Sequence, residues 1–216
     1  MLSAALALAL TVAGPPAPDT TNAGILIARH AAEVYRGLSS FRADFVQVID
    51  DSMLGQLITK GRLYQSGTSK LSMRFTDPDG DALVMDGQSL WVYTPSTAPR
   101  QVIKLPLPSG PTFGPNVVAW LLDNPTERYK VTYVRPDYLD GSTVDVIRLT
   151  PIDQTLAFAR ATLWIGREDA LPHRVELREK SGTVRTLTFS RIRINQAVPD
   201  DIFRFDTPSG VRVVER

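Results

Sequence analysis

Hydrophobic and polar residues alternate along the chain between Gly61 and Pro95. In one stretch, the apolar residues Leu71, Met73 and Phe75 interleave with polar side chains. A period of two places the two sets on opposite faces of a β-sheet. Two Asp-Gly pairs supply turns, because glycine tolerates positive φ and aspartate can bond to nearby backbone. The segment therefore predicts four short antiparallel strands with one apolar face, which another part of the chain must cover.

The same alternation recurs at short intervals in the rest of the chain, as is typical of meandering all-β proteins. We expect strands near residues 41–49, 55–65, 70–76, 81–86, 89–95, 100–104, 129–135, 143–150, 155–166, 172–180 and 183–194, and a last strand pair around Pro208-Ser209-Gly210. The predicted fold class is mainly β (α+β). We expect a curved, incompletely closed antiparallel β-barrel of about eleven strands, with short helices on its concave side.

Two segments have helical patterns instead. Apolar residues recur at helical spacing from Gly24 to Leu38, which predicts an amphipathic helix. Residues 116–122 are almost wholly apolar and lie between Pro115 and Asn124-Pro125. A short helix that is apolar all round should be buried, so we expect this one to insert into the concave surface as a plug. One further helical turn is expected at residues 198–203.

The N-terminus has the apolar core of an export signal, although no Lys or Arg precedes it. Residues 1–13 form an apolar run that is too short to span a bilayer, and a Pro-rich polar segment follows it. We expect residues 1–23 to be a signal peptide and linker, with cleavage after Ala13, Ala17 or Ala23, and residues 24–216 to form one domain. The chain has no cysteine, which excludes disulfides, thiolate catalysis and lipid attachment at a cysteine.

Charged residues indicate no catalytic or nucleic-acid site. The formal net charge is +1 and no long basic run occurs, so nucleic acid is not an expected partner. The two histidines are far apart, and no nucleophile–base motif or phosphate-binding loop is present. We therefore expect no enzyme activity, no cofactor and no metal. Seven arginines occur singly along predicted strands and are expected on solvated outer faces: Arg62, Arg74, Arg148, Arg160, Arg174, Arg178 and Arg185.

Several segments together resemble the LolA family of periplasmic carriers of outer-membrane lipoproteins. The matching segments are Leu38 to Gln47, Gly61-Arg62-Leu63-Tyr64, Pro78-Asp79, Leu83 to Pro95, Phe203-Arg204-Phe205 and Pro208 to Val213. Their order and spacing cover nearly the whole chain after the leader. The most specific block is Asp86-Gly87-Gln88-Ser89-Leu90-Trp91-Val92-Tyr93-Thr94-Pro95.

The resemblance implies a half-open β-barrel with a helical lid over an apolar cavity. The cavity would take the acyl chains of acylated lipoproteins from an inner-membrane lipoprotein-releasing ABC transporter. It would pass them, as a monomer in the periplasm, to an outer-membrane lipoprotein receptor of similar fold. That receptor is itself a lipoprotein, so the lack of cysteine favours the soluble carrier.

One position departs from the family pattern. The family commonly has an Arg-Pro pair between the second and third strands, and its arginine ties the lid closed by hydrogen bonds to lid backbone. Gly67-Thr68 stands there in this chain. We expect either that Arg42 or Arg74 takes this role or that packing alone holds the lid.

The resemblance and the alternation together give candidate site residues. The expected acyl-chain cavity is lined by Phe41, Phe45, Leu63, Leu71, Met73, Phe75, Met85, Trp91, Leu163 and Ile165. The expected lid consists of Phe113, Val117, Val118, Trp120 and Leu121. Three other functions stay open: a carrier of another lipid or amphiphile, a lipoprotein-sensing signalling module, which we expect to need a second domain, and an exported hydrolase, for which no nucleophile–base pair is found.

Overall fold

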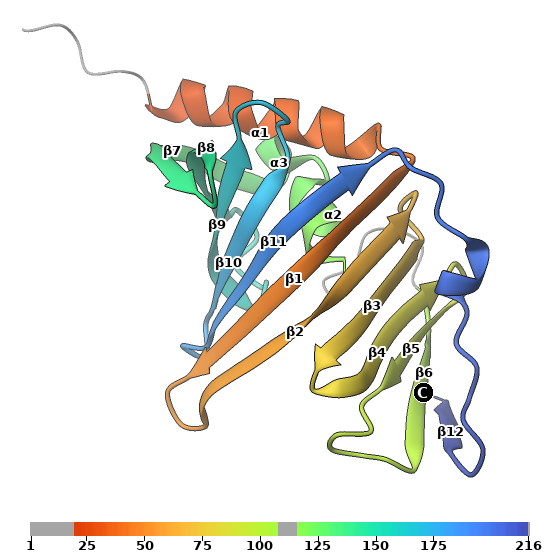
Figure 1. Ribbon diagram of the computed structural model, residues 1–216. Coiled ribbons are helices and arrows are strands. Elements are labelled where there is room, and N and C mark those ends of the chain that lie inside the picture. The colour runs from red at the N-terminus through yellow and green to blue at the C-terminus, as the bar shows by residue number, and fades with distance from the viewer. Residues whose placement is uncertain (1–19, 108–115, 216) are drawn as a thin grey trace, which may run out of the picture.

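The computed structural model describes residues 20–107 and 116–215, which form one curved twelve-stranded sheet with α-helices on its concave side (Figure 1). The helices are α1 Thr20–Arg36, α2 Val117–Leu122, α3 Pro125–Arg128 and the 3₁₀ helix η1 Asp200–Phe203. The strands are β1 Ser40–Asp51, β2 Gly55–Ser66, β3 Lys70–Asp77, β4 Asp79–Asp86, β5 Ser89–Tyr93, β6 Gln101–Pro106, β7 Tyr129–Leu139, β8 Ser142–Pro151, β9 Phe158–Gly166, β10 Pro172–Glu179, β11 Val184–Ile194 and β12 Arg212–Glu215.

The sheet bends but does not close. Its strand order is β12-β6-β5-β4-β3-β2-β1-β11-β10-β9-β8-β7, so β7 and β12 are the two edges and are not paired with each other. Register shifts near Ala43, Lys60 and Phe75 lie in the central strands. Such irregularities increase local bending and twist. The predicted incompletely closed, mainly β architecture is confirmed.

The end of the chain differs from the prediction. The expected strand pair around Pro208 is wrong, because β12 instead pairs in parallel with β6, Arg212 beside Gln101. The segment before Pro208 makes side-chain contacts in place of a ladder: the ring of Phe205 stacks on Trp91 with their centroids 5.6 Å apart. β12 thus covers an edge of β6 that would otherwise expose unpaired backbone groups.

Helix α1 begins earlier and packs more closely than the pattern indicates. It starts at Thr20, inside the region expected to be linker, while residues 1–19 with the expected signal sequence lie outside the described residues. At Gly24 the helix backbone approaches β7, and a β-carbon there would lie 2.7 Å from the amide nitrogen of Tyr133. Only glycine allows such close contact between a helix and a strand.

Helix α3 was not predicted, because Asn124-Pro125 was interpreted as the end of the preceding helix. Pro125 is instead the first residue of α3, where its missing N–H is harmless. Asn124 reverses the chain in the left-handed region, with φ of 46°. Together α2 and α3 form a compact helical pair against the sheet.

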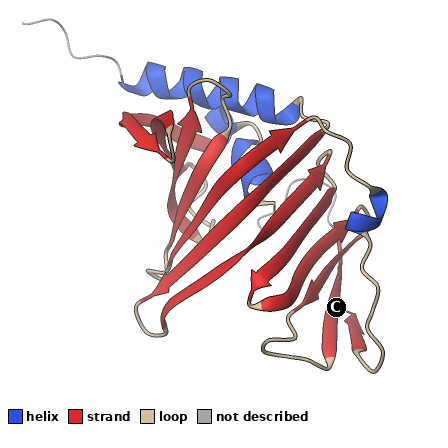
Figure 2. Cartoon of the chain, viewed as in Figure 1, coloured by secondary structure: helices blue, strands red, loops and turns tan. Residues whose placement is uncertain are grey.

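The helices cover only part of the concave face. Figure 2 shows α1, α2 and α3 gathered over one end of the sheet, whereas η1 lies apart from them and contacts β3 and β4. Under the helices, Trp120 of α2 packs against Phe158 of β9 and Tyr129 of β7, with ring centroids 5.4 and 6.3 Å apart. The other half of the apolar face therefore lacks a helix of its own among the described residues.

A glycine in β2 lets the central strands pack an aromatic pair. Gly61 lies beside Phe45 of β1, whose ring meets Phe75 edge-on at 5.3 Å. A β-carbon at Gly61 would collide with the carbonyl oxygen of Arg74 and lie 2.8 Å from the Phe45 ring. The ring of Phe45 therefore occupies the space that a side chain at position 61 would need.

We predict that Gly61→Ala lowers the free energy of unfolding by about 1–3 kcal/mol, since the added methyl group overpacks the sheet. Urea unfolding of the two proteins measures the change. The control is Gly37→Ala, where a β-carbon would meet only ordinary contacts at 3.5 Å, and we expect that variant to stay within about 1 kcal/mol of the wild type. Equal stability of all three proteins would contradict this packing.

Candidate functional site

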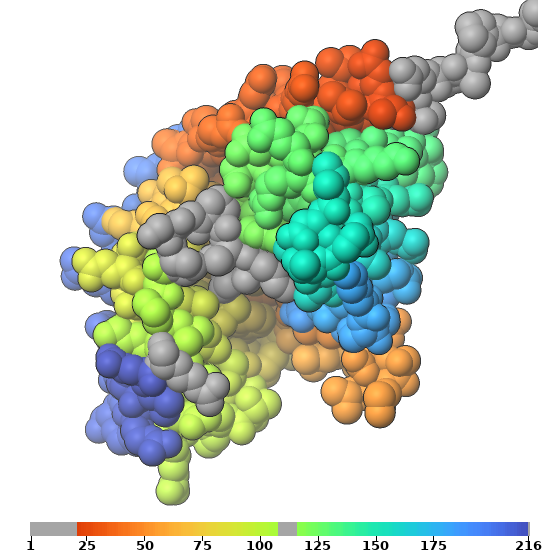
Figure 3. All heavy atoms as spheres, turned by 180° about the vertical axis from the view of Figure 1, so that it is seen from behind, coloured from red at the N-terminus to blue at the C-terminus, as the bar shows by residue number. Residues whose placement is uncertain are grey.

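An apolar cavity of about 400 Å³ lies between the two halves of the sheet. One wall comes from β3, β4 and β5, the other from β10 and β11, and α2 contributes Val117 from above. Seen from behind, a recess lies between the yellow-green strands and the orange and blue hairpins (Figure 3). The lining residues are Gln47, Met73, Leu83, Leu90, Val92, Val117, Val175, Leu177, Arg185 and Leu187.

Most of the expected cavity residues lie on the concave face but not at the cavity surface. Met73 lines the cavity itself. The others form the packed core around it, buried or partly buried: Phe41, Phe45, Leu63, Leu71, Phe75, Met85, Leu163 and Ile165. Phe41, for example, packs against Phe189 and Tyr35, with ring centroids 5.7 and 6.0 Å away.

The expectation that Trp91 lines the cavity was wrong. Trp91 alternates with Leu90 and Val92, which do line it, so its side chain lies on the outer face. There it stacks on Phe205 and its indole nitrogen donates to Asp86 at 2.7 Å. Residues 200–205 cover this outer patch, as the blue segment beside β3 and β4 in Figure 1 shows.

Several wall residues of the cavity were not predicted, although period-two alternation indicates them. Period-two alternation applied to β5 places Leu90 and Val92 on one face and Trp91 on the other. Choosing the largest aromatic residue overrode that pattern. The wall from β10 and β11, with Val175, Leu177 and Leu187, required knowledge of which strands face each other across the opening.

The expected lid residues divide between two environments. Val117 faces the cavity, whereas Val118, Trp120 and Leu121 are buried against the core. The side chain of Asn116 caps the helix by accepting from the Ala119 amide at 3.2 Å. Phe113 lies outside the described residues.

An arginine does hold the backbone of α2, but from a position that the sequence did not suggest. Arg128, in the last turn of α3, donates to the carbonyl oxygen of Trp120 at 2.7 Å, and its guanidinium lies 4.6 Å from the Trp120 ring centroid. The candidates Arg42 and Arg74 were wrong, because both lie on the outer face. Arg42 stacks on Tyr64, and Arg74 donates to the carbonyl of Arg204 at 3.0 Å.

A buried polar cluster joins α1, β2 and the start of α2. The hydroxyl of Tyr35 donates to Oε1 of Gln65 at 2.6 Å and lies 3.5 Å from Oδ1 of Asn116. Gln65 in turn donates to the carbonyl of Gly67 at 2.8 Å. Burial raises the pKa of the Tyr35 phenol far above its usual range, despite the opposing effect of Gln65, so Tyr35 stays a neutral donor.

One charged side chain among the described lining residues faces the cavity. Arg185 was expected on an outer face, but it lies directly beside Leu177 of β10 and precedes Leu187 in the inward row of β11. Period-two alternation with Leu187 and Phe189 places Arg185 on the inward face, although its charge favours the outer one. Of the other six arginines expected on solvated faces, two are exposed, Arg62 and Arg148, and four are half-buried: Arg74, Arg160, Arg174 and Arg178.

The described residues show neither a metal cluster nor a membrane-crossing helix. No group of three or more His, Asp or Glu side chains in residues 20–107 and 116–215 is arranged to hold a metal ion. In the same part of the chain, none of the helices is both long and apolar enough to span a bilayer.

Comparison with known proteins gives the family. A family model described as outer membrane lipoprotein carrier protein LolA matches residues 36–206. The outer-membrane lipoprotein carrier protein of Halorhodospira halophila is 30% identical, and the match covers 95% of this chain and 93% of that protein. The outer-membrane lipoprotein carrier protein of Nitrosospira multiformis is 28% identical, and the match covers 80% of this chain and 81% of that protein. The crystal structure of an uncharacterized conserved protein from Thermus thermophilus shares the fold at a TM-score of 0.57 and 14% identity, covering 88% of this chain and 99% of its own. The chain belongs to the LolA family of outer-membrane lipoprotein carrier proteins.

Proposed function

We propose that this protein carries acylated lipoproteins across the periplasm by holding their acyl chains in the apolar cavity. The observation that carries the proposal is the cavity of about 400 Å³, walled mainly by aliphatic side chains, in a member of a carrier family. Its volume is within the range of small-molecule sites, about 300–1,000 Å³. The family is one of carrier proteins rather than enzymes.

The lining suits a flexible hydrocarbon chain. Each methylene group that leaves water contributes about 0.8 kcal/mol, so a few carbons of each chain provide useful affinity. Met73 can adapt its shape to different chains because its side chain is unbranched and polarizable. The core residues behind the wall, such as Phe45 and Leu71, would support the cavity without touching cargo.

Transfer would involve two further proteins. We infer that an inner-membrane ABC transporter supplies the lipoprotein and that an outer-membrane receptor of similar fold accepts it, with this protein acting as a monomer. Export would use the expected signal peptide within residues 1–23. Cleavage after Ala13 or Ala17 would leave α1 complete, whereas cleavage after Ala23 would remove its first turn.

A second candidate function is a carrier of another amphiphile. The cavity lining is mainly apolar, and its two polar residues are Gln47 and Arg185. A free lipid could therefore occupy the same site. A lipoprotein carrier would hold an acylated protein, whereas an amphiphile carrier would hold a free lipid. A synthetic triacylated lipopeptide therefore tests the first function.

We predict that Val117→Trp weakens binding of a fluorescent synthetic triacylated lipopeptide by at least about tenfold, because the indole would fill the cavity from α2. The matched control is Val46→Trp on the outer face of β1, where the side chain is 38% exposed, and we expect unchanged binding. Fluorescence anisotropy measures both affinities, and urea unfolding checks the fold. Failure of the wild type to bind the lipopeptide, or equal binding by the two variants, would refute the proposal.

Arg128 should control how readily the lid opens. We predict that Arg128→Met speeds hydrogen exchange of the α2 amides by about tenfold, since it removes a charged hydrogen bond to the Trp120 carbonyl. Exchange measured by mass spectrometry on peptides covering residues 116–123 gives the rate. Arg135→Met, which removes only the exposed pair with Asp137, is the control. An unchanged α2 rate in Arg128→Met would show that packing alone holds the lid.

A further inference from the structure

Arg185 stands at the rim of the cavity, where apolar wall meets solvent. It is the first residue of β11 whose side chain lies on the concave face, and the next one on that face is Leu187. On the neighbouring strand β10, Arg185 is paired with Leu177. Its side chain is 40% exposed. The guanidinium is thus next to both the hydrocarbon site and water, the position that the head of a bound amphiphile would take.

The hydrogen-bonding capacity of Arg185 is largely unused. Among the described residues, its one hydrogen bond goes to Oε1 of Glu179 and is long, at 3.4 Å. Guanidinium–carboxylate bonds are shorter, about 2.7–2.9 Å, and often bidentate. Arginine has five N–H donors. A second oxyanion could therefore bind Arg185 without the loss of a strong existing pair.

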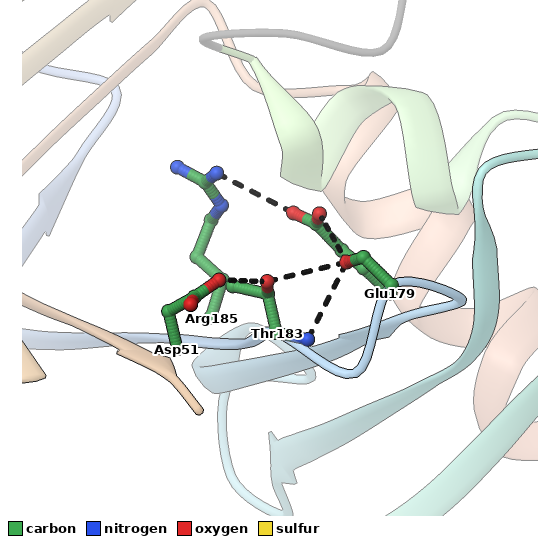
Figure 4. A network of polar contacts seen from close by, with 5 residues as sticks. Asp51, Glu179, Thr183 and Arg185 are labelled. Carbon is green, nitrogen blue, oxygen red and sulfur yellow. Dashed lines mark hydrogen bonds and ion pairs between the residues drawn. The ribbon is translucent and has the colours of Figure 1, made fainter. Parts of the chain in front are cut away.

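Neighbouring polar contacts fix this rim. Figure 4 shows the guanidinium of Arg185 and the carboxylate of Glu179 on the same side of the turn between β10 and β11. The hydroxyl of Thr183 donates to Asp51 at 2.7 Å and so ties this turn to the β1–β2 hairpin. That bond, with the amides of Met53 and Leu54, keeps the pKa of Asp51 below its usual range.

The adjacent strand continues the polar rim. Gln47 of β1 lines the cavity beside Leu187, and its Nε2 donates weakly to the hydroxyl of Thr59 at 3.4 Å. The rim therefore contains two polar groups, the guanidinium of Arg185 and the side-chain amide of Gln47. The rest of the cavity lining is apolar. The nearby apolar wall lowers the local dielectric constant, which strengthens the attraction between the guanidinium and an oxyanion.

We propose that Arg185 binds an oxyanion that is joined directly to the acyl chains in the cavity, so that the site prefers amphiphiles with a carboxylate or phosphate head. This inference rests on the proposed acyl-chain site and favours the second candidate function, with a free amphiphile as cargo, because the ester and amide linkages of a lipoprotein's acyl chains carry no oxyanion. Glu179 competes with the head for Arg185 and sets the strength of the preference. Carboxylate and phosphate heads share this chemistry, and the experiment separates them.

The test compares three probes of equal chain length: laurate, dodecyl phosphate and neutral 1-dodecanol, titrated at pH 8 and low salt. We expect wild-type protein to bind at least one anionic probe about five- to tenfold more tightly than dodecanol, a modest effect because the arginine is partly exposed. Arg185→Gln should remove this preference and leave dodecanol affinity within about twofold. Glu179→Gln should increase the preference, since it frees the guanidinium.

Arg148→Gln, on the exposed outer face of β8, is the matched control and should keep the preference. A preference retained in Arg185→Gln, or equal wild-type affinity for all three probes, would overturn the assignment while leaving the acyl-chain site intact. Binding of none of the probes by wild-type protein would instead refute the acyl-chain site on which the inference rests. The ratio of laurate to dodecyl phosphate affinity shows which head the rim prefers.

Discussion

The structure depends on an apolar sheet face that is larger than the helices packed on it. Twelve strands curve without closing, and α1, α2 and α3 cover the end formed by β7 to β9. The aromatic contacts of Trp120 with Phe158 and Tyr129 secure that end as an ordinary core. Among the described residues, the part of this face between β3–β5 and β10–β11 that no helix covers lines the cavity. Burial of apolar surface is favourable, so we expect an apolar ligand to bind there.

Polar groups define the limits of this cavity. Above it, Asn116 caps α2, and Arg128 holds the Trp120 carbonyl and ring. At the rim, Arg185 and Glu179 mark the change from hydrocarbon to water. At Gly67, where the resemblance predicted a departure from the family's arginine, the carbonyl accepts from Gln65. The arginine that contacts the backbone of α2 is Arg128, which lies within the helical segment itself.

Much of the fold could be predicted from sequence because the chain signals strands by alternation and turns by Asp-Gly pairs. The failures have physical causes. Pro125 was interpreted as a terminator although it can equally start a helix, and β12 found a parallel partner that no local pattern specifies. Cavity residues were harder to predict than core residues. Alternation indicates on which face of the sheet a side chain lies, but not whether other side chains or a cavity lie against it. Leu71 and Met73 share a face, yet only Met73 reaches the cavity. Trp91 and Arg185 were assigned to the wrong faces by residue type, against the pattern of their neighbours.

The most direct measurement uses two adjacent residues of β5 that lie on opposite faces. A photo-reactive benzoylphenylalanine is placed at Leu90, in the cavity wall, or at Trp91, which packs on Phe205 outside. Cells that express each variant are labelled with an alkyne fatty acid and irradiated. We predict an acyl-chain crosslink, to a lipoprotein in the proposed function, from position 90 and none from position 91. Equal crosslinking at both positions, or none at position 90, would contradict the account.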